Sequence, residues 1–207
     1  MDAIDRDATF GGQVVVVGSD RPGCLGLERA RRRGIPTVVE AVDAHPDRPT
    51  WERAMVGRLE QHRPDVVVLA GFMRLLSPAF LARWPQAVVN VHPSLLPAFP
   101  GAHGVRDALD HGVKVTGTTV HIVDEHVDHG PIIAQRPVEV REDDEVATLH
   151  ERIKGVEHDL LPAAVKLVCH GRVRIEGRRT RILPAVDARA LTTLDLTDAL
   201  TDAERIP

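Results

Sequence analysis

Short apolar runs alternate along the chain with segments whose apolar residues recur at helical spacing. A short apolar run bounded by turn residues is typical of a strand buried on both faces, whereas apolar residues three or four apart indicate the inner face of a helix. Thr50 and Ser77 are expected to cap two of the helices. The pattern predicts strands over 13–20, 35–42, 64–72 and 87–92, and helices over 25–34, 50–62 and 77–84.

The pattern changes after residue 103, where a short helix over 104–112 is followed by two β-rich runs over 113–123 and 130–140. A long helix should then begin near Asp143 or Asp144 and kink at Pro162. The pattern over 172–182 predicts a terminal hairpin. Strands alternating with helices predict an α/β fold with a doubly wound, mostly parallel sheet and an antiparallel C-terminal portion. Such sheets bind ligands at the carboxyl ends of their strands.

Composition narrows the class of partner. The 207 residues carry a formal net charge of −4 and only 3% aromatics, which argues against a nucleic-acid or anionic-membrane surface. Only two cysteines, Cys24 and Cys169, are present, so no disulfide framework is expected and the reducing cytoplasm is the expected compartment. The polar start does not resemble a signal peptide, and no apolar run is long enough to span a bilayer.

Asn90 and His92 stand two apart at the end of the strand over 87–92, so both side chains should project from one face. An amide that can donate to a developing oxyanion, beside an imidazole that can carry a proton, suits acyl transfer. The pair alone is weak evidence, because a surface Asn and His ending a strand would look the same.

The surrounding motifs are more specific. Residues 71–104, with "NVHPSLLPAFPGAHG", and residues 112–135, with "HIVDEHVDHGPI", resemble the phosphoribosylglycinamide formyltransferase family. The resemblance runs from about Val14 to about Arg174 with matching spacing between the motifs. It implies a formyltransferase-like variant of the Rossmann fold, and transfer of a formyl group from 10-formyltetrahydrofolate to the amine of glycinamide ribonucleotide in purine biosynthesis. No metal cofactor, nucleic acid or membrane is implied.

The resemblance also assigns residues. It implies that Asn90 stabilises the oxyanion, that His92 donates a proton to the leaving folate nitrogen, and that Asp128 holds His92 and favours its protonated form. His103 and His121 would line the pocket. The implied substrate-binding residues are Lys154, Gly155, Val156 and Glu157. The implied folate-binding residues are Arg48, Met73, Arg74, Leu75, Leu76, Asn90, Asp124, Glu125, His126, Val127 and Asp128.

A metal site is the alternative interpretation of the segment over 120–132, which concentrates histidines and acids. His121, His126 and His129 are spaced five and three apart in a strand that runs into a loop. This is not the tight ligand spacing typical of zinc sites. The sequence therefore predicts no metal site here, and it places His126 and His129 in solvent.

The N-terminal segment departs from the family pattern. Family members open with a strand and a glycine-rich phosphate-binding loop, whereas residues 13–26 resemble the second strand and residues 1–12 the end of the first helix. We expect an N-terminally incomplete formyltransferase domain over 1–183, without the first strand, and a disordered tail over 184–207. The expected reason is a start that lies inside a longer natural protein. A truly short chain that binds the ribonucleotide poorly is the alternative.

Two other functions stay open at this stage. A 10-formyltetrahydrofolate hydrolase would pass the formyl group to water, and an inactive remnant would bind folate without turnover. A methionyl-tRNA formyltransferase is disfavoured, because the chain after Gly171 is short and ends acidic. The family often pairs through its sheet region, which allows a homodimer, but the sequence does not fix the oligomeric state.

Overall fold

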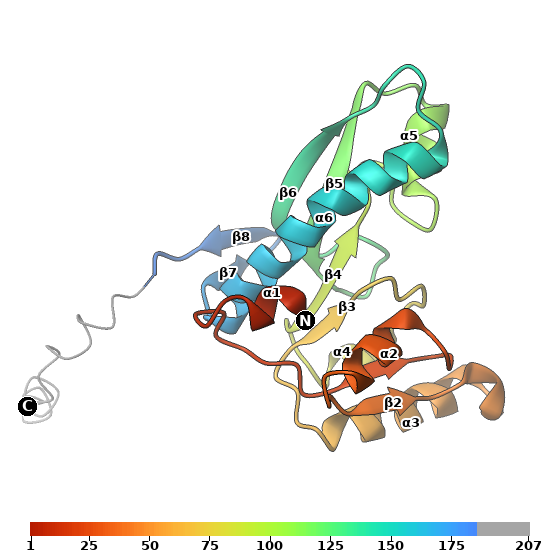
Figure 1. The fold of residues 1–207 in the computed structure, drawn as a ribbon, viewed down its shortest axis with the longest axis vertical. Helices are drawn as coiled ribbons and strands as arrows, with labels where there is room; N and C mark the ends of the chain where they lie inside the picture. The colour runs from red at the N-terminus through yellow and green to blue at the C-terminus, as the bar shows by residue number, and fades with distance from the viewer. Residues whose placement is uncertain (186–207) are drawn as a thin grey trace, which may run out of the picture.

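Helices and strands follow one another largely in the expected order in the computed structural model, which describes residues 1–185 (Figure 1). The strands are β1 (Val17–Ser19), β2 (Thr37–Val39), β3 (Val67–Leu69), β4 (Val88–His92), β5 (Val115–Ile122), β6 (Ile132–Glu139), β7 (Val173–Glu176) and β8 (Arg179–Ile182). The helices are α1 (Asp2–Asp5), α2 (Leu25–Arg31), α3 (Arg48–Glu60), α4 (Pro78–Leu81), α5 (Gly104–Asp110) and α6 (Val146–Cys169), with a 3-10 turn η1 (Val42–Ala44). Beyond residue 185, the expected tail lies outside the described residues.

Strand pairing confirms the α/β class with an antiparallel C-terminal portion. β1 pairs in parallel with β2, and β3 pairs in parallel with β4. β5 runs antiparallel to both β4 and β6, and β7 and β8 form the expected terminal hairpin. In the described part of the chain these pairs make three sheets, with strand orders β1-β2, β3-β4-β5-β6 and β7-β8.

The two parallel pairs are not joined to each other within residues 1–185. In this described part, β1 and β3 each pair along one edge, and Val17 and Val67 both line a cleft of about 2200 Å³ that reaches between the two sheets. A strand edge without a neighbour leaves its backbone N–H and C=O groups to water. The run over 13–20 was predicted as one strand. In the structure only residues 17–19 of it form a strand, because only these residues lie beside β2 and pair with it.

Helix ends show where the sequence pattern was insufficient. The predicted Thr50 cap is wrong: α3 begins after Asp47, whose side chain accepts a hydrogen bond from the Thr50 backbone N–H at 2.7 Å. The predicted Ser77 cap is confirmed by the hydrogen bond from Phe80 N to Ser77 Oγ at 3.2 Å. α6 continues as one helix through Pro162, since the turns on both sides of the proline pack against the four-stranded sheet.

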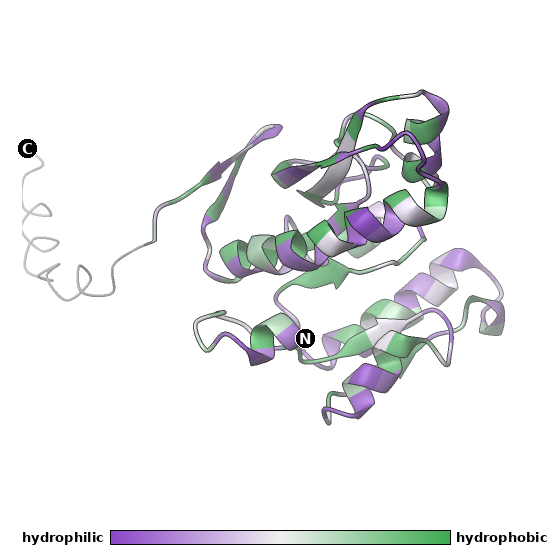
Figure 2. Ribbon diagram, turned by 45° about the horizontal axis from the view of Figure 1, so that its top comes forward, coloured by the Kyte–Doolittle hydropathy of each residue, from purple (hydrophilic) through white to green (hydrophobic). Residues whose placement is uncertain are grey.

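α6 supplies most of the cover for the four-stranded sheet. Its Leu160 and Ala164 pack with Val89 and Val120, while its Leu149 and Ile153 form a second cluster near α5. A third cluster surrounds Trp51, where α3 and α4 meet the parallel strands. Figure 2 shows the short strands at the centre as predominantly hydrophobic and the helices as mixed. No helix in the described part is long and apolar enough to cross a membrane.

Candidate active site

The carboxyl end of β4 projects two polar side chains toward the cleft. Asn90 is half-buried and His92 is only 4% exposed, and both line the cleft. In the ladder, Asn90 lies opposite His121 of β5, and His92 lies opposite Thr119. Residues two apart on a strand share a face, so the placement predicted for Asn90 and His92 is the one observed.

His92 is held between two acceptors. Its Nδ1 lies 3.2 Å from Oδ2 of Asp128, and its Nε2 lies 2.8 Å from the carbonyl oxygen of Phe99. A neutral imidazole can donate from only one nitrogen, whereas the protonated ring donates from both. Each ring nitrogen of His92 therefore faces one oxygen acceptor.

Asp128 comes from the loop between β5 and β6 and takes a left-handed backbone conformation, with φ 50°. Its Oδ2 also accepts a hydrogen bond from the backbone N–H of Gly101 at 2.7 Å. Burial opposes ionisation of this carboxyl group, but the hydrogen bond from the Gly101 amide and the nearby His92 ring outweigh it, so the pKa of Asp128 is lowered. Asp128 is therefore an anion at neutral pH.

Gly130 lets the same loop turn back against β5. A Cβ atom at this position would stand 1.8 Å from the carbonyl oxygen of Ile122 and 3.2 Å from the backbone nitrogen of Asp124. Real Cβ atoms do not approach that closely, so the loop that carries Asp128 depends on glycine here.

His121 links the members of the site. It is 1% exposed, and its Nε2 lies 3.2 Å from Nδ2 of Asn90 and 3.7 Å from Oδ1 of Asp128. Its Nδ1 lies 2.9 Å from the carbonyl oxygen of Ile122 and can donate to it, which leaves Nε2 as the acceptor for the Asn90 amide. One N–H bond of Asn90 is thus held by His121, and the other has no partner among residues 1–185 and can donate to a group in the cleft.

Two residues of α6 belong to the same cleft. Glu157 and Lys154 line the cleft, and Thr118 Oγ1 donates to Glu157 Oε1 at 3.4 Å. Burial raises the pKa of Glu157, and nearby His150 only partly offsets this. The neighbouring Val156, expected in the substrate site, instead packs against the cluster around Leu149.

Residues 73–76, predicted to bind the folate, line the cleft after β3. Met73 is 69% exposed and Leu75 is 61% exposed, so core packing does not account for either. Arg74 is turned aside, with its Nε 2.6 Å from Oδ2 of Asp20, while Leu76 packs against the cluster around Trp51. Arg48 donates to the carbonyl oxygen of Leu75 and is not among the described residues that line the cleft.

The loop before Asp128 supplies another part of the wall. Asp124, Glu125, His126 and Val127 all line the cleft, and Val127 leaves 48% of its surface exposed. His103, the residue just before α5, also lines the cleft. Gly155 lies on α6 and is exposed, outside the residues that line the cleft in the described part.

Backbone groups of the loop between β4 and α5 belong to the site but were missed from the sequence. The carbonyl of Phe99 and the amide of Gly101 contact His92 and Asp128, respectively. Every residue carries such groups, so no residue type marks them. The only available signal was the density of Pro and Gly in "PAFPGAHG", which indicates a tightly shaped loop.

Comparison with known proteins points to one family. Residues 2–165 match the model of the family described as formyl transferase. Phosphoribosylglycinamide formyltransferase of Mycobacterium tuberculosis is 50% identical over 166 residues, which cover 80% of this chain and 77% of that protein. The crystal structure of glycinamide ribonucleotide transformylase 1 from Symbiobacterium toebii superposes with a TM-score of 0.82 at 49% identity, covering 84% of this chain and 82% of that one.

A formyltetrahydrofolate deformylase is also structurally similar, but at lower identity. The enzyme from Pseudomonas syringae pv. tomato superposes with a TM-score of 0.76 at 29% identity. The match covers 83% of this chain and 57% of the deformylase.

Proposed function

The chain belongs to the formyl transferase family, and we propose that it transfers a formyl group from 10-formyltetrahydrofolate to the amine of glycinamide ribonucleotide. The observation that carries the proposal is the approach of His92 Nδ1 to Asp128 Oδ2 at 3.2 Å beside Asn90, at the end of β4 in the cleft. The similarity to phosphoribosylglycinamide formyltransferases supports the choice of substrates. The reaction is expected in the cytoplasm and in purine biosynthesis.

Asn90 supplies the donor for the developing negative charge. When the amine attacks the formyl carbon, the carbonyl oxygen becomes an oxyanion, and the amide N–H that His121 does not hold can donate to it. Because His121 fixes the amide, this donor is oriented before the reaction begins. A preorganised donor of this kind stabilises the transition state more than the ground state.

His92 supplies the proton for the nitrogen that leaves the formyl carbon. Asp128 is anionic and lies at His92 Nδ1, so it orients the ring and can stabilise positive charge on it during proton transfer. The other nitrogen, Nε2, donates to the Phe99 carbonyl in this structure, so that bond must open before Nε2 can donate elsewhere. The amine attacks directly, so no covalent bond to the protein is required. Its nitrogen loses one proton as the folate nitrogen gains one, so the overall reaction consumes no proton.

The cleft wall fits a flat, largely apolar ring system. Met73, Leu75 and Val127 expose apolar surface around the site, and loops supply backbone groups for polar ring edges. We assign the folate to this wall. The amine substrate is assigned to the side of Glu157 and Lys154, which face the cleft from α6.

The assay that tests this proposal measures two products from 10-formyltetrahydrofolate, with and without glycinamide ribonucleotide. Formyl transfer that depends on the ribonucleotide, with little formate release, is expected. Formate release at the same rate without the ribonucleotide would indicate the hydrolase instead. Folate binding without either product would indicate the inactive remnant. Full turnover by a His92→Ala variant would overturn the assigned mechanism.

A further inference from the structure

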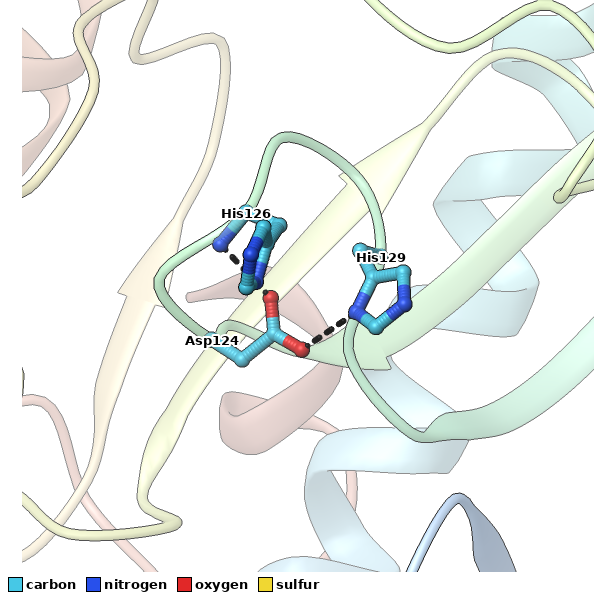
Figure 3. Close-up of side chains that lie close together, drawn as sticks. All are labelled: Asp124, His126 and His129. Atoms are coloured by element: carbon cyan, nitrogen blue, oxygen red, sulfur yellow. Dashed lines mark hydrogen bonds and ion pairs between the residues drawn. The ribbon is translucent and has the colours of Figure 1, made fainter.

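The loop between β5 and β6 gathers three side chains of the metal-ligating type, Asp124, His126 and His129, and the proposed reaction gives none of them a catalytic role. Asp124, His126 and His129 each direct one ligand atom into a common region, and these atoms lie within 4.8 Å of one another. Figure 3 shows the two imidazole rings and the carboxylate arising from one loop, with the His129 ring turned to Asp124.

Asp124 organises this group. Its Oδ2 accepts from Nδ1 of His129 at 2.8 Å, and its Oδ1 accepts from the backbone N–H of His126 at 2.9 Å. The rings of His126 and His129 have centroids 5.1 Å apart. The side chain of His129 is 50% exposed and that of Asp124 is 33% exposed, so an ion can reach them from solvent.

The spacing in the sequence did not reveal this group, because it suggested a different trio. His121 is buried, where it contacts Asn90, and it does not reach the exposed rings of His126 and His129. The third member of the group is Asp124 instead of His121. The group therefore consists of two imidazoles and one carboxylate around a single point.

We propose that Asp124, His126 and His129 bind one divalent transition-metal ion of the zinc type. Two imidazole nitrogens and one carboxylate oxygen suit such ions, and three protein ligands leave a further coordination position open to water or another ligand. Ligand bonds of about 2.0–2.2 Å place tetrahedral ligand atoms about 3.3 Å apart. The Asp124–His129 contact would open slightly and the longer separations in the group would close.

Arg178 is expected to compete with the metal ion for His129. It lies in the turn between β7 and β8, and its Nη1 is 2.9 Å from Nδ1 of His129 and also contacts Nε2 of the same ring. A guanidinium carries a positive charge at all working pH values and competes for the ring nitrogens that the metal needs. Arg178 is exposed, so it can move away when the ion binds.

Direct metal titration tests the site without any use of the proposed formyl transfer. The full chain, free of any histidine tag and treated with a chelator, is titrated with Co²⁺ while visible absorption is recorded. One saturable equivalent is expected. His126→Ala and His129→Ala should each weaken binding by about tenfold or more, and Arg178→Ala should strengthen it. His111→Ala, which removes an exposed histidine from the end of α5, is the matched control and should change nothing.

The cobalt titration of the His126→Ala, His129→Ala double variant decides whether the metal site exists. A cobalt spectrum that survives unchanged in the His126→Ala, His129→Ala double variant would overturn the site, as would the lack of saturable binding by the unmodified chain. An Arg178→Ala variant with unchanged affinity would overturn the competition. Circular dichroism of each variant establishes that it is folded, and Zn²⁺ displacement of Co²⁺ establishes that both ions use the same ligands.

Discussion

His92 and Asp128 meet across two segments that are remote in sequence: His92 ends β4, and Asp128 stands in the loop after β5. The 3.2 Å approach of Nδ1 to Oδ2 depends on the left-handed backbone of Asp128 and on the Gly101 amide, which holds the same carboxylate oxygen. The contact between His92 and Asp128 therefore depends on the packing of three segments: β4, the loop that carries Gly101 and the loop that carries Asp128.

Replacing Asp128 with Asn should keep the shape of this contact and remove its charge. The Asp128→Asn variant is expected to lower kcat by about 10²–10⁴-fold, because the protonated form of His92 loses its counter-charge and general acid catalysis is worth this much. Steady-state formyl transfer measures the loss. Asp110→Asn, an exposed site on α5, is the matched control. Unchanged kcat in Asp128→Asn would contradict the assigned role.

His121 is expected to act through Asn90. His121→Ala removes the acceptor that fixes the Asn90 amide, so kcat should fall by up to about 10²-fold while KM for either substrate changes less. His121→Gln offers an amide oxygen in a similar place and should recover part of the loss. A purely structural role predicts a different result: both variants would lower the melting temperature and leave the kcat of the folded fraction intact.

The sequence predicted element types well wherever a long periodic segment was present. α6 was expected from the spacing of Leu149, Ile153 and Leu160, and all three are buried in it. Strand lengths were overestimated, because a run such as 13–20 is apolar throughout whereas hydrogen bonding depends on which neighbour lies beside it. The Asp47 cap was missed because Asp47 and Thr50 are both capping residues, and the choice follows from where the chain enters the helix.

The site was predictable to different extents from different kinds of signal. The shared face of Asn90 and His92 follows from strand geometry alone. The nearness of Asp128 does not, since two loops and a strand pairing separate it from His92, and only the family resemblance indicated it. The group of Asp124, His126 and His129 was not predicted, because the fold of the loop, and not the spacing in the sequence, buries His121 and brings the other three side chains together.

Gly130→Ala should destabilise the chain more than a typical substitution. The added methyl would stand 1.8 Å from the Ile122 carbonyl oxygen, so the backbone must move, at a cost of about 3 kcal/mol of unfolding free energy. Gly57→Ala is the matched control. It lies in α3 with nothing within 4 Å of the new Cβ, and it should stabilise by about 0.5–1 kcal/mol. Urea unfolding measures both; equal effects would contradict the loop geometry.

Asp7 should titrate far below an ordinary aspartate. The Lys166 ammonium, 2.6 Å away, and Thr9 lower the pKa of Asp7 to about 2. Because this pKa is lower in the folded state, its stabilising contribution is present above the ordinary value near 3.8 and is lost as pH falls through about 2. Carboxyl NMR shifts should show the value returning toward 3.8 in Lys166→Met. Lys114→Met, at an exposed pair with Glu142, should leave it unchanged.

Glu157 is expected to favour function at the expense of stability. Burial raises the pKa of this carboxyl in the folded state, so its contribution to stability is complete below the ordinary value near 4.5 and is lost as pH rises through the raised value. Glu157→Gln removes the buried charge and should therefore raise the melting temperature at pH 7, while the two proteins should converge near pH 4.

Glu157→Gln should also weaken binding of the amine substrate. A hydrogen bond to a charged carboxylate is stronger than one to a neutral amide, so KM for the ribonucleotide should rise by about 10–10²-fold while KM for the folate stays near its original value. Glu142→Gln, at an exposed pair with Lys114, is the matched control for both measurements. A Glu157→Gln protein that melts lower at pH 7 and keeps its KM would show that Glu157 is a structural residue whose charge is satisfied in the folded chain.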